Sequence, residues 1–146
     1  MDNYLLPLMK AYEQLMSLPY FSGCIVFDID DTLIDSETHR PIEPTVDFYH
    51  MVKKLGFKTV IVTAREGTED NIQKTIDELA NMGIKDYTHI FFRLPQVMNL
   101  YLFKKNCRKH IHEKLCPIVM SIGDKNWDFG EYGGMGVLVG KDFRQY

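Results

Sequence analysis

The stretch FDIDDTLIDS, residues 27–36, places two carboxylates, Asp28 and Asp30, one residue apart where an apolar run ends. The preceding residues 24–27 have the β-prone, wholly apolar character of a short strand buried in a parallel sheet. Ligands of open α/β sheets bind at the carboxyl edge, where these carboxylates would emerge. A hard divalent cation with oxygen ligands would relieve the repulsion between them. The stretch therefore predicts phosphoryl transfer at a metal site, although taken alone it is also compatible with a simple turn.

Length and composition favour one soluble domain. With 146 residues the chain can fill one core and is too short for two ordinary domains. No apolar segment has the length that spans a bilayer, and the first residues lack the pattern of a signal peptide, so we expect a cytoplasmic protein. Three cysteines without CxxC spacing, Cys24, Cys107 and Cys116, are predicted to be reduced structural thiols. The net charge of −3 argues against a general nucleic-acid coating role.

Strands alternate with helices along the chain. Strands are predicted over 24–27, 58–63, 89–93, 118–122 and 136–140, and helices over 3–17, 46–55, 68–82 and 97–115. In the first helix we expect the apolar residues Leu5, Leu6, Met9, Tyr12, Leu15 and Met16 to pack beside the sheet. The alternation predicts right-handed crossovers and a three-layer α/β/α, Rossmann-like parallel sheet. We assign residues 1–146 to one domain, with an N-terminal helix over 3–17 and a core over 23–142.

Polar groups follow the later strands in a regular order. Thr63 closes the second predicted strand, a Lys104-Lys105 pair lies in the last predicted helix, and GDKNWD, residues 123–128, follows the fourth strand. Each has an ordinary explanation as a strand-terminal threonine, a surface lysine or a Gly-Asp turn. Because the carboxyl ends of parallel strands share one edge, we expect these groups to meet Asp28 and Asp30 there.

Together these elements resemble the four ordered motifs of the haloacid dehalogenase (HAD) superfamily of phosphohydrolases. The similarity is greatest to the acid-phosphatase branch, subfamily IIIB. It extends to PIEPTVDFYHMVKKLG, IVTAR, FRLP, IGDKNWD and an aromatic-Lys-x-x-x-Arg element at Phe103, Lys104 and Arg108. The resemblance implies a HAD-like fold and the hydrolysis of phosphate monoesters.

The resemblance and the chemistry of the residue types suggest catalytic and metal-binding roles. Asp28 would be the nucleophile that forms an aspartyl-phosphate, and Asp30 would protonate the leaving oxygen and later activate water. Mg²⁺ is the expected cofactor, because it takes few protein ligands and bridges to phosphate. Its ligand set would be Asp28, the main-chain carbonyl of Asp30 and Asp124, with Asp128 orienting a water or supporting Asp124.

Phosphate would be bound by the hydroxyl of Thr63 and by a lysine. The aromatic-Lys-x-x-x-Arg element favours Lys104, and Lys105 remains an alternative. Arg65 lies just beyond a strand end, where it would contact the substrate or form a structural ion pair. Lys105 is a further candidate for a substrate contact.

The motif spacing leaves no room for an inserted cap domain, since ordinary core elements already occupy the intervals between motifs. An open site favours a large phosphorylated substrate. An oligonucleotide is one candidate because Lys105, Arg108 and Lys109 cluster near the presumed catalytic lysine. No membrane partner is expected, and nucleic acid is expected only as a substrate.

Two other functions fit an α/β fold that carries these carboxylates. A receiver-like signalling domain also uses acidic residues, a threonine and a lysine around an aspartyl-phosphate. Its phosphoacceptor lies on the third strand, however, where this chain has only FFRLP. A catalytically idle binding or storage protein on the same fold is the second alternative, against which the complete set of carboxylates argues.

Overall fold

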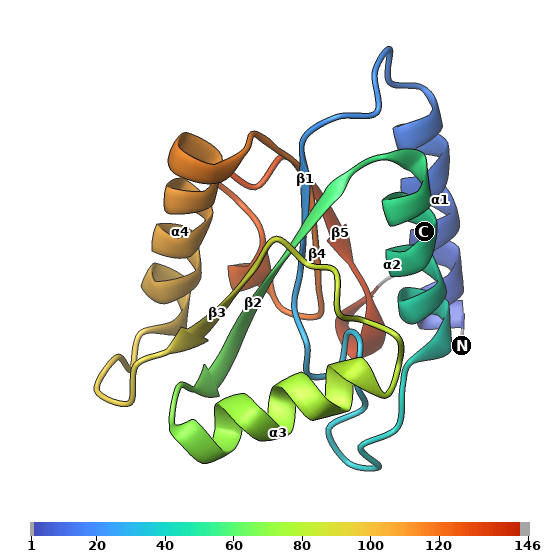
Figure 1. Ribbon diagram of the computed structural model, residues 1–146. Coiled ribbons are helices and arrows are strands. Elements are labelled where there is room, and N and C mark those ends of the chain that lie inside the picture. The colour runs from blue at the N-terminus through green and yellow to red at the C-terminus, as the bar shows by residue number, and fades with distance from the viewer. Residues whose placement is uncertain (1, 144–146) are drawn as a thin grey trace.

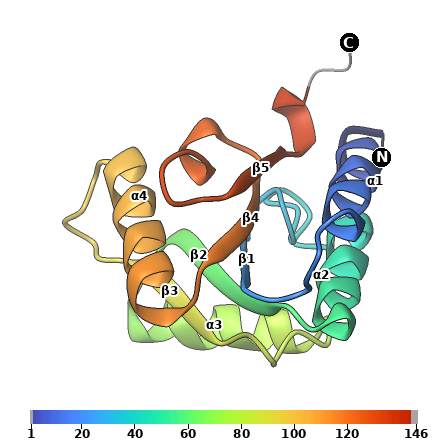
Figure 2. The same ribbon diagram turned by 90° about the horizontal axis from the view of Figure 1, so that it is seen from above.

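The computed structural model describes residues 2–143, which form a five-stranded parallel sheet with helices on both faces (Figures 1 and 2). The strands are β1 (Cys24–Phe27), β2 (Lys58–Glu66), β3 (His89–Arg93), β4 (Ile118–Gly123) and β5 (Met135–Leu138). The helices are α1 (Asp2–Met16), α2 (Glu43–Leu55), α3 (Glu69–Ala80) and α4 (Leu100–His110), which continues as a π-helical turn, Ile111–Leu115. This confirms the predicted α/β/α, Rossmann-like fold of a single small domain.

The strand order is β3-β2-β1-β4-β5, with β1 in the centre. The chain builds one half of the sheet outward from β1 and then crosses back through α4 to start the other half at β4. This is the order of a Rossmann fold, whereas receiver-like folds have the order 2-1-3-4-5. The receiver-like alternative is therefore wrong. The reversal of direction lies between β1 and β4, and ligands of open α/β sheets bind at such a switch point.

The two faces of the sheet carry different helices. Figure 2 shows α4 on one side and α1, α2 and α3 on the other. Ile25 and Phe27 of β1 belong to the larger core under α1 to α3, whereas Cys24 and Val26 belong to the smaller core under α4. Side chains alternate along a strand, so the next residue, Asp28, falls on the side of α4.

Local sequence signals set three of the helix ends. Gly56 stops α2 in a left-handed conformation with φ 109°, and the Thr68 hydroxyl caps α3 by accepting from Asn71 N at 3.2 Å. The last helix begins at Leu100 and not at residue 97, because the Asn99 side chain caps it by accepting from Leu102 N at 3.0 Å. Its start thus corrects the prediction.

The packing of α1 also differs from the prediction. Its buried residues are Pro7, Leu8, Ala11 and Leu15, whereas Leu5, Met9, Tyr12 and Met16 are exposed. Since α1 packs against α2 and β5 along one stripe, only one set of positions at helical spacing is covered. The sequence carries apolar residues on two faces of this helix, and periodicity alone did not identify the covered one.

The prediction of three reduced thiols is wrong. Cys24 and Cys116 form a disulfide with a Cα–Cα distance of 5.9 Å, although 92 positions separate them in sequence. The parallel pairing of β1 with β4 brings these two chain segments side by side. Cys107 is free and lies on the buried face of α4. Among residues 2–143, no helix combines the length and apolar character needed to cross a membrane.

Candidate active site

The strand register gathers the polar motifs at one level of the carboxyl edge. Phe27 of β1 pairs with Ile61 of β2 and with Ile122 of β4. One residue further along each strand come Asp28, Val62 and Gly123, and one beyond these come Thr63 and Asp124. The backbone continues this pairing, because Asp28 N donates to Ile122 O at 3.0 Å. Motifs far apart in sequence therefore meet through parallel pairing.

Lys104 lies at the centre of this site. Its ammonium donates to Asp28 Oδ1 at 2.7 Å, to Asp128 Oδ1 at 2.6 Å and to the Val62 carbonyl at 3.2 Å, and the residue is only 2% exposed. Burial lowers the pKa of Lys104, but Asp28 and Asp128 outweigh burial and raise it above its ordinary value. Lys104 is therefore a charged lysine shared by two carboxylates.

Lys105 points elsewhere. Its ammonium lies 3.4 Å from the Glu131 carboxylate and its side chain is 35% exposed. Of the two lysines left open by the sequence, the structure brings Lys104 and not Lys105 to Asp28. Arg108 is buried, so it is not available to an oligonucleotide together with Lys105 and Lys109, as the clustering in sequence suggested.

Three carboxylates surround the space next to Lys104. Oxygen atoms of Asp28, Asp124 and Asp128 all lie within 4.8 Å of one another. Burial, together with a hydrogen bond and the charge of Asp28, raises the pKa of Asp124 to about 8. Burial and Asp28 also raise the pKa of Asp128 to about 6, with Lys104 opposing them. Crowded carboxylates with raised pKa values favour a cation in their midst.

The donor set of this cluster suits Mg²⁺, because it consists of carboxylate oxygens without nitrogen or sulfur. Asp128 is already engaged, since its Oδ1 accepts from Lys104 and its Oδ2 accepts from Lys125 N at 3.1 Å. Both oxygens of Asp28 are engaged as well, by Lys104 and by Thr32, so hydrogen bonding by itself does not rank Asp28 and Asp128 as metal ligands. A glycine is required at position 123, because a Cβ there would collide with the Asp128 carboxylate.

Asp30 lies outside the acidic cluster. Its carboxylate accepts two hydrogen bonds from the Arg65 guanidinium, at 3.0 Å from Nε and 2.8 Å from Nη2. Arg65 Nη1 also donates to Thr75 and Glu78 of α3, both at 3.0 Å. The hydrogen bond to Asp30 raises the pKa of Arg65 above its ordinary value. Arg65, left open between a substrate contact and an ion pair, forms ion pairs here.

The residues after β1 fold into one tight turn that orients Asp28. The amides of Thr32, Leu33 and Ile34 all donate to the Ile29 carbonyl. This turn aims the Thr32 hydroxyl at Asp28 Oδ2, at 3.1 Å. The sequence motif contains Thr32, but its contact with Asp28 was not anticipated; the spacing of four residues in a turn is the signal that could have revealed it.

Thr63 is buried within β2, which continues to Glu66 beyond the predicted end of this strand, and it lies next to the level of Asp28. Its hydroxyl oxygen accepts from Arg65 N at 3.1 Å. One segment, residues 63–65, thus serves both sides of the site, with Thr63 near Asp28 and Arg65 bound to Asp30. That residues 63–65 contact both halves of the site was not anticipated from the sequence.

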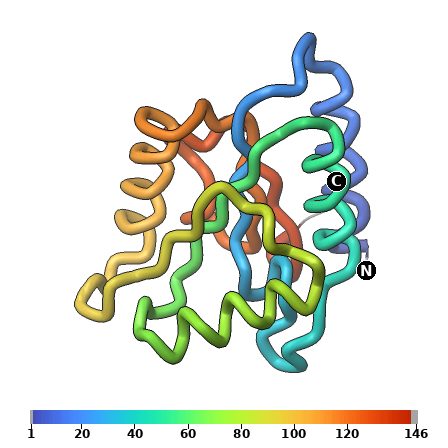
Figure 3. Tube along the Cα trace, viewed as in Figure 1, coloured from blue at the N-terminus to red at the C-terminus, as the bar shows by residue number. Residues whose placement is uncertain are grey.

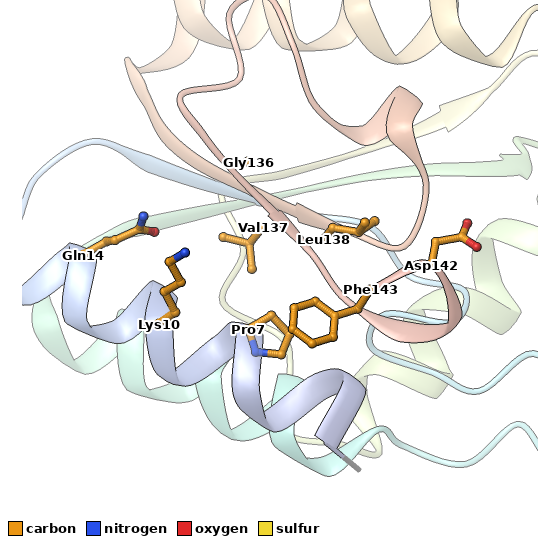
Figure 4. Close-up of a pocket in the computed structure, with 8 residues that line it drawn as sticks. All are labelled: Pro7, Lys10, Gln14, Gly136, Val137, Leu138, Asp142 and Phe143. Atoms are coloured by element: carbon orange, nitrogen blue, oxygen red, sulfur yellow. The ribbon is translucent and has the colours of Figure 1, made fainter. Parts of the chain in front are cut away.

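No helix or strand is inserted between β1 and α2, where a cap domain could cover these residues. The only excursion between β1 and α2 is a short hairpin-like turn near residues 34–41, visible at the carboxyl end of β1 in Figure 3. Directly beneath Asp28 and Lys104 lies a cavity of only about 10 Å³. A hollow of about 500 Å³ lies between α1 and β5 (Figure 4), and none of its lining residues belongs to the acidic cluster.

Comparison with known proteins agrees with this geometry. A family model described as "HAD superfamily, subfamily IIIB (Acid phosphatase)" matches residues 35–142. The chain belongs to this family. As a subfamily IIIB member, it carries Thr63, Lys104, Asp124 and Asp128 inside the matched segment, whereas Asp28 and Asp30 precede that segment. No curated protein sequence matches the chain.

Among solved structures, the chain is similar to one described as "Structure of Pnkp1/Rnl/Hen1 complex". The TM-score is 0.66 at 17% sequence identity, and the match covers 84% of this chain and 47% of the other chain. This subfamily IIIB domain therefore spans about half the length of that relative. At this identity the likeness concerns the fold alone.

Proposed function

We propose that this protein is a Mg²⁺-dependent phosphatase that hydrolyses phosphate monoesters through an aspartyl-phosphate at Asp28. The observation that carries the proposal is the position of Asp28 at the carboxyl edge. There its carboxylate is oriented by Lys104 and Thr32 and lies within 4.8 Å of two further carboxylates. Membership in an acid-phosphatase family supports the same reaction.

In the first step a carboxylate oxygen of Asp28 attacks phosphorus, and the bond from phosphorus to the ester oxygen breaks. The departing alkoxide takes a proton from Asp30. In the second step water attacks the phosphorus of the aspartyl-phosphate and gives a proton to Asp30, which frees Asp28 and inorganic phosphate. Lys104 and the Thr63 hydroxyl stabilise the charge on the phosphate oxygens.

This scheme requires the Asp30 side chain to change its contacts. In the structure its carboxylate is held by Arg65, and its side chain is 42% exposed. A half-exposed carboxylate can rotate toward a bound ester with little loss of packing. We propose that Arg65 holds Asp30 between turnovers and keeps it apart from the acidic cluster.

The cation would be held by Asp28 and Asp124, with the main-chain carbonyl of Asp30 as a third ligand and Asp128 in support. When bound, Mg²⁺ supplies positive charge that neutralises the carboxylates and polarises the phosphate. Lys104 would remain the protein's own positive charge beside Asp28.

We propose a large phosphorylated molecule as the substrate. The supporting observation is that the cavity lined by Asp28, Lys104 and Asp128 has a volume of only about 10 Å³, so it would bury little of a small ester. An oligonucleotide is less well supported than the sequence suggested, because Arg108 is buried and Lys105 is paired with Glu131. A rate that falls steeply with salt would favour the oligonucleotide over other large phosphorylated molecules.

The deciding experiment is turnover of p-nitrophenyl phosphate with Mg²⁺ and after chelation, combined with trapping of the intermediate. Borohydride reduces an aspartyl-phosphate to homoserine, which peptide mass analysis would locate at position 28. We expect Mg²⁺-dependent turnover and a modified Asp28. Absence of turnover with every phosphate ester tested would favour the idle binding protein, and modification elsewhere would refute the assigned nucleophile.

A further inference from the structure

Arg108 lies one helical turn beyond Lys104 on α4 and is 1% exposed. Residues four apart on a helix share a face, so both side chains point toward the segment that follows β4. Arginine is rarely buried to this extent unless its guanidinium is well bonded. Its partners therefore indicate what the residue does.

The guanidinium of Arg108 donates to three backbone carbonyls of one loop. Nη1 donates to Trp127 O at 2.7 Å, Nη2 to Phe129 O at 2.7 Å, and Nε to Glu131 O at 3.3 Å. The planar fork of arginine can satisfy several acceptors in fixed directions, which an ammonium cannot do. Arg108 thus holds residues 127–131 in one conformation.

The loop is shaped to receive this side chain. Gly133 packs so closely that a Cβ would lie 3.3 Å from Arg108 Cδ and 3.1 Å from Ser121 Oγ. Gly130 has φ 112°, a conformation that favours glycine, and is flanked by the bonded residues Phe129 and Glu131. The glycines of this segment therefore permit the close approach of the loop to Arg108.

Arg108 makes no ion pair with a carboxylate among residues 2–143. Burial lowers its pKa below the ordinary value, with Asp128 as the largest opposing influence. A buried charge is costly unless it is fully bonded, so the three carbonyls and the nearby acidic cluster are what stabilise it. The donors of Arg108 bond to the loop, whereas Lys104 bonds to the nucleophile Asp28.

The same loop carries Asp128 at its start. Helix α4 thus contacts this segment at two points, through Lys104 at the Asp128 carboxylate and through Arg108 at the backbone on either side of Asp128. Asp124 lies between β4 and this anchored loop. Movement of the loop would alter the spacing of the acidic oxygens, on which the affinity for a small cation depends.

We propose that Arg108 is a positioning residue that fixes the loop bearing Asp128, and with it Asp124, in the arrangement that binds the cation. Any effect of Arg108 on catalysis rests on the proposed function, but the inference itself is tested by cation binding. Residues that orient metal ligands typically change affinity by about 10–100-fold when they are replaced.

The test compares Arg108→Met, Arg108→Lys and the matched control Lys109→Met, whose side chain is exposed on the next position of α4. Titration calorimetry would measure the dissociation constants for Mg²⁺ and Mn²⁺ on protein shown by circular dichroism to be folded. We expect about 10–100-fold weaker binding for Arg108→Met, an intermediate loss for Arg108→Lys and no change for the control. Hydrogen exchange should also accelerate in residues 127–131 of the Arg108 variants.

Unchanged cation affinity in the folded Arg108 variants would overturn the proposal, even if their melting temperatures fell, because that result describes a purely structural role. If Arg108→Met does not fold, the cation affinity of Arg108→Lys tests the proposal in the same way. Wild-type protein that binds neither cation would also overturn it. Weakened binding without any phosphatase activity in the wild type would instead refute the proposed function and leave this inference standing.

Discussion

Asp28 and Asp30 are separated by one residue, yet their side chains lie in different surroundings. Asp28 is buried on the side of α4, where it shares the ammonium of Lys104 with Asp128. The Asp30 side chain is 42% exposed and accepts two hydrogen bonds from Arg65, which also bonds to α3. The two carboxylates thus pair with different basic side chains, lie near different helices and differ in solvent exposure.

This difference shows how one short motif can supply two chemical roles. A nucleophile must be held in a fixed position, and the hydrogen bond from the buried Lys104 does this for Asp28. An acid/base group must gain and lose protons and reach different atoms, which exposure to solvent permits. Variants on each side of the site can show whether the two carboxylates differ in function as they differ in surroundings.

The largest effect is expected for Asp28→Asn. The amide has nearly the shape of the carboxylate but is a poor nucleophile, so turnover of p-nitrophenyl phosphate should fall by at least about 10⁴-fold. Circular dichroism should show an intact fold. Wild-type-like rates in this variant would remove the basis for a covalent intermediate.

Asp30→Asn should have an effect that depends on the leaving group. Proton donation contributes about 10²–10⁴-fold and matters most when the departing alkoxide is basic. We therefore expect a large loss with an alkyl phosphate and a small loss with p-nitrophenyl phosphate, measured as kcat/KM. Equal losses with both esters would show that Asp30 acts only through the metal or through Arg65.

Replacing Lys104, which contacts Asp28, should lower both activity and stability. Loss of one charge-stabilising donor typically lowers kcat by about 10²–10³-fold. Lys104→Met should also lower the free energy of unfolding by about 3 kcal/mol, because two buried carboxylates lose their partner. The matched control Lys105→Met should keep a kcat and a free energy of unfolding near those of the wild type, measured by kinetics and denaturant unfolding. Larger losses for Lys105→Met than for Lys104→Met would assign phosphate binding to Lys105.

Asp124→Ala should raise the Mg²⁺ concentration needed for half-maximal rate by about tenfold or more, because one of few direct ligands is lost. A parallel series with Ca²⁺ should show inhibition, since Ca²⁺ prefers more ligands at longer distances. Full activity of the wild type after exhaustive chelation would contradict the assignment of the acidic cluster.

The smallest effect concerns the metal-free protein at different pH values. The pKa of Asp124 is raised from 3.8 to about 8, and that of Asp128 to about 6, so the folded state binds more protons than the unfolded state between these values. Stability should therefore decrease as pH rises from about 4 to about 8. Melting temperatures in chelator should fall over this range, and added Mg²⁺ should restore them; a rise with pH would contradict the sign.

Much of the fold could be predicted because local signals agreed with each other. The strand His89–Arg93 has the predicted bounds, and Gly56 and Thr68 end or begin helices as expected. The order of Asp28, Thr63, Lys104 and Asp124 along the chain also indicated one shared edge. In α1, where apolar residues occupy two faces, the pattern was ambiguous and the prediction of the buried residues was wrong.

The sequence by itself determined the alternation of strands and helices and the residue types at the carboxyl edge, because both follow from periodicity and short motifs. Only the tertiary structure decided which basic side chain pairs with each carboxylate. It also decided that Cys24 forms a disulfide with Cys116 and that Arg108 is buried against a loop. The physical reason is that these contacts depend on strand register and helix rotation. Both are fixed by packing across the whole core and leave no signature in any single segment.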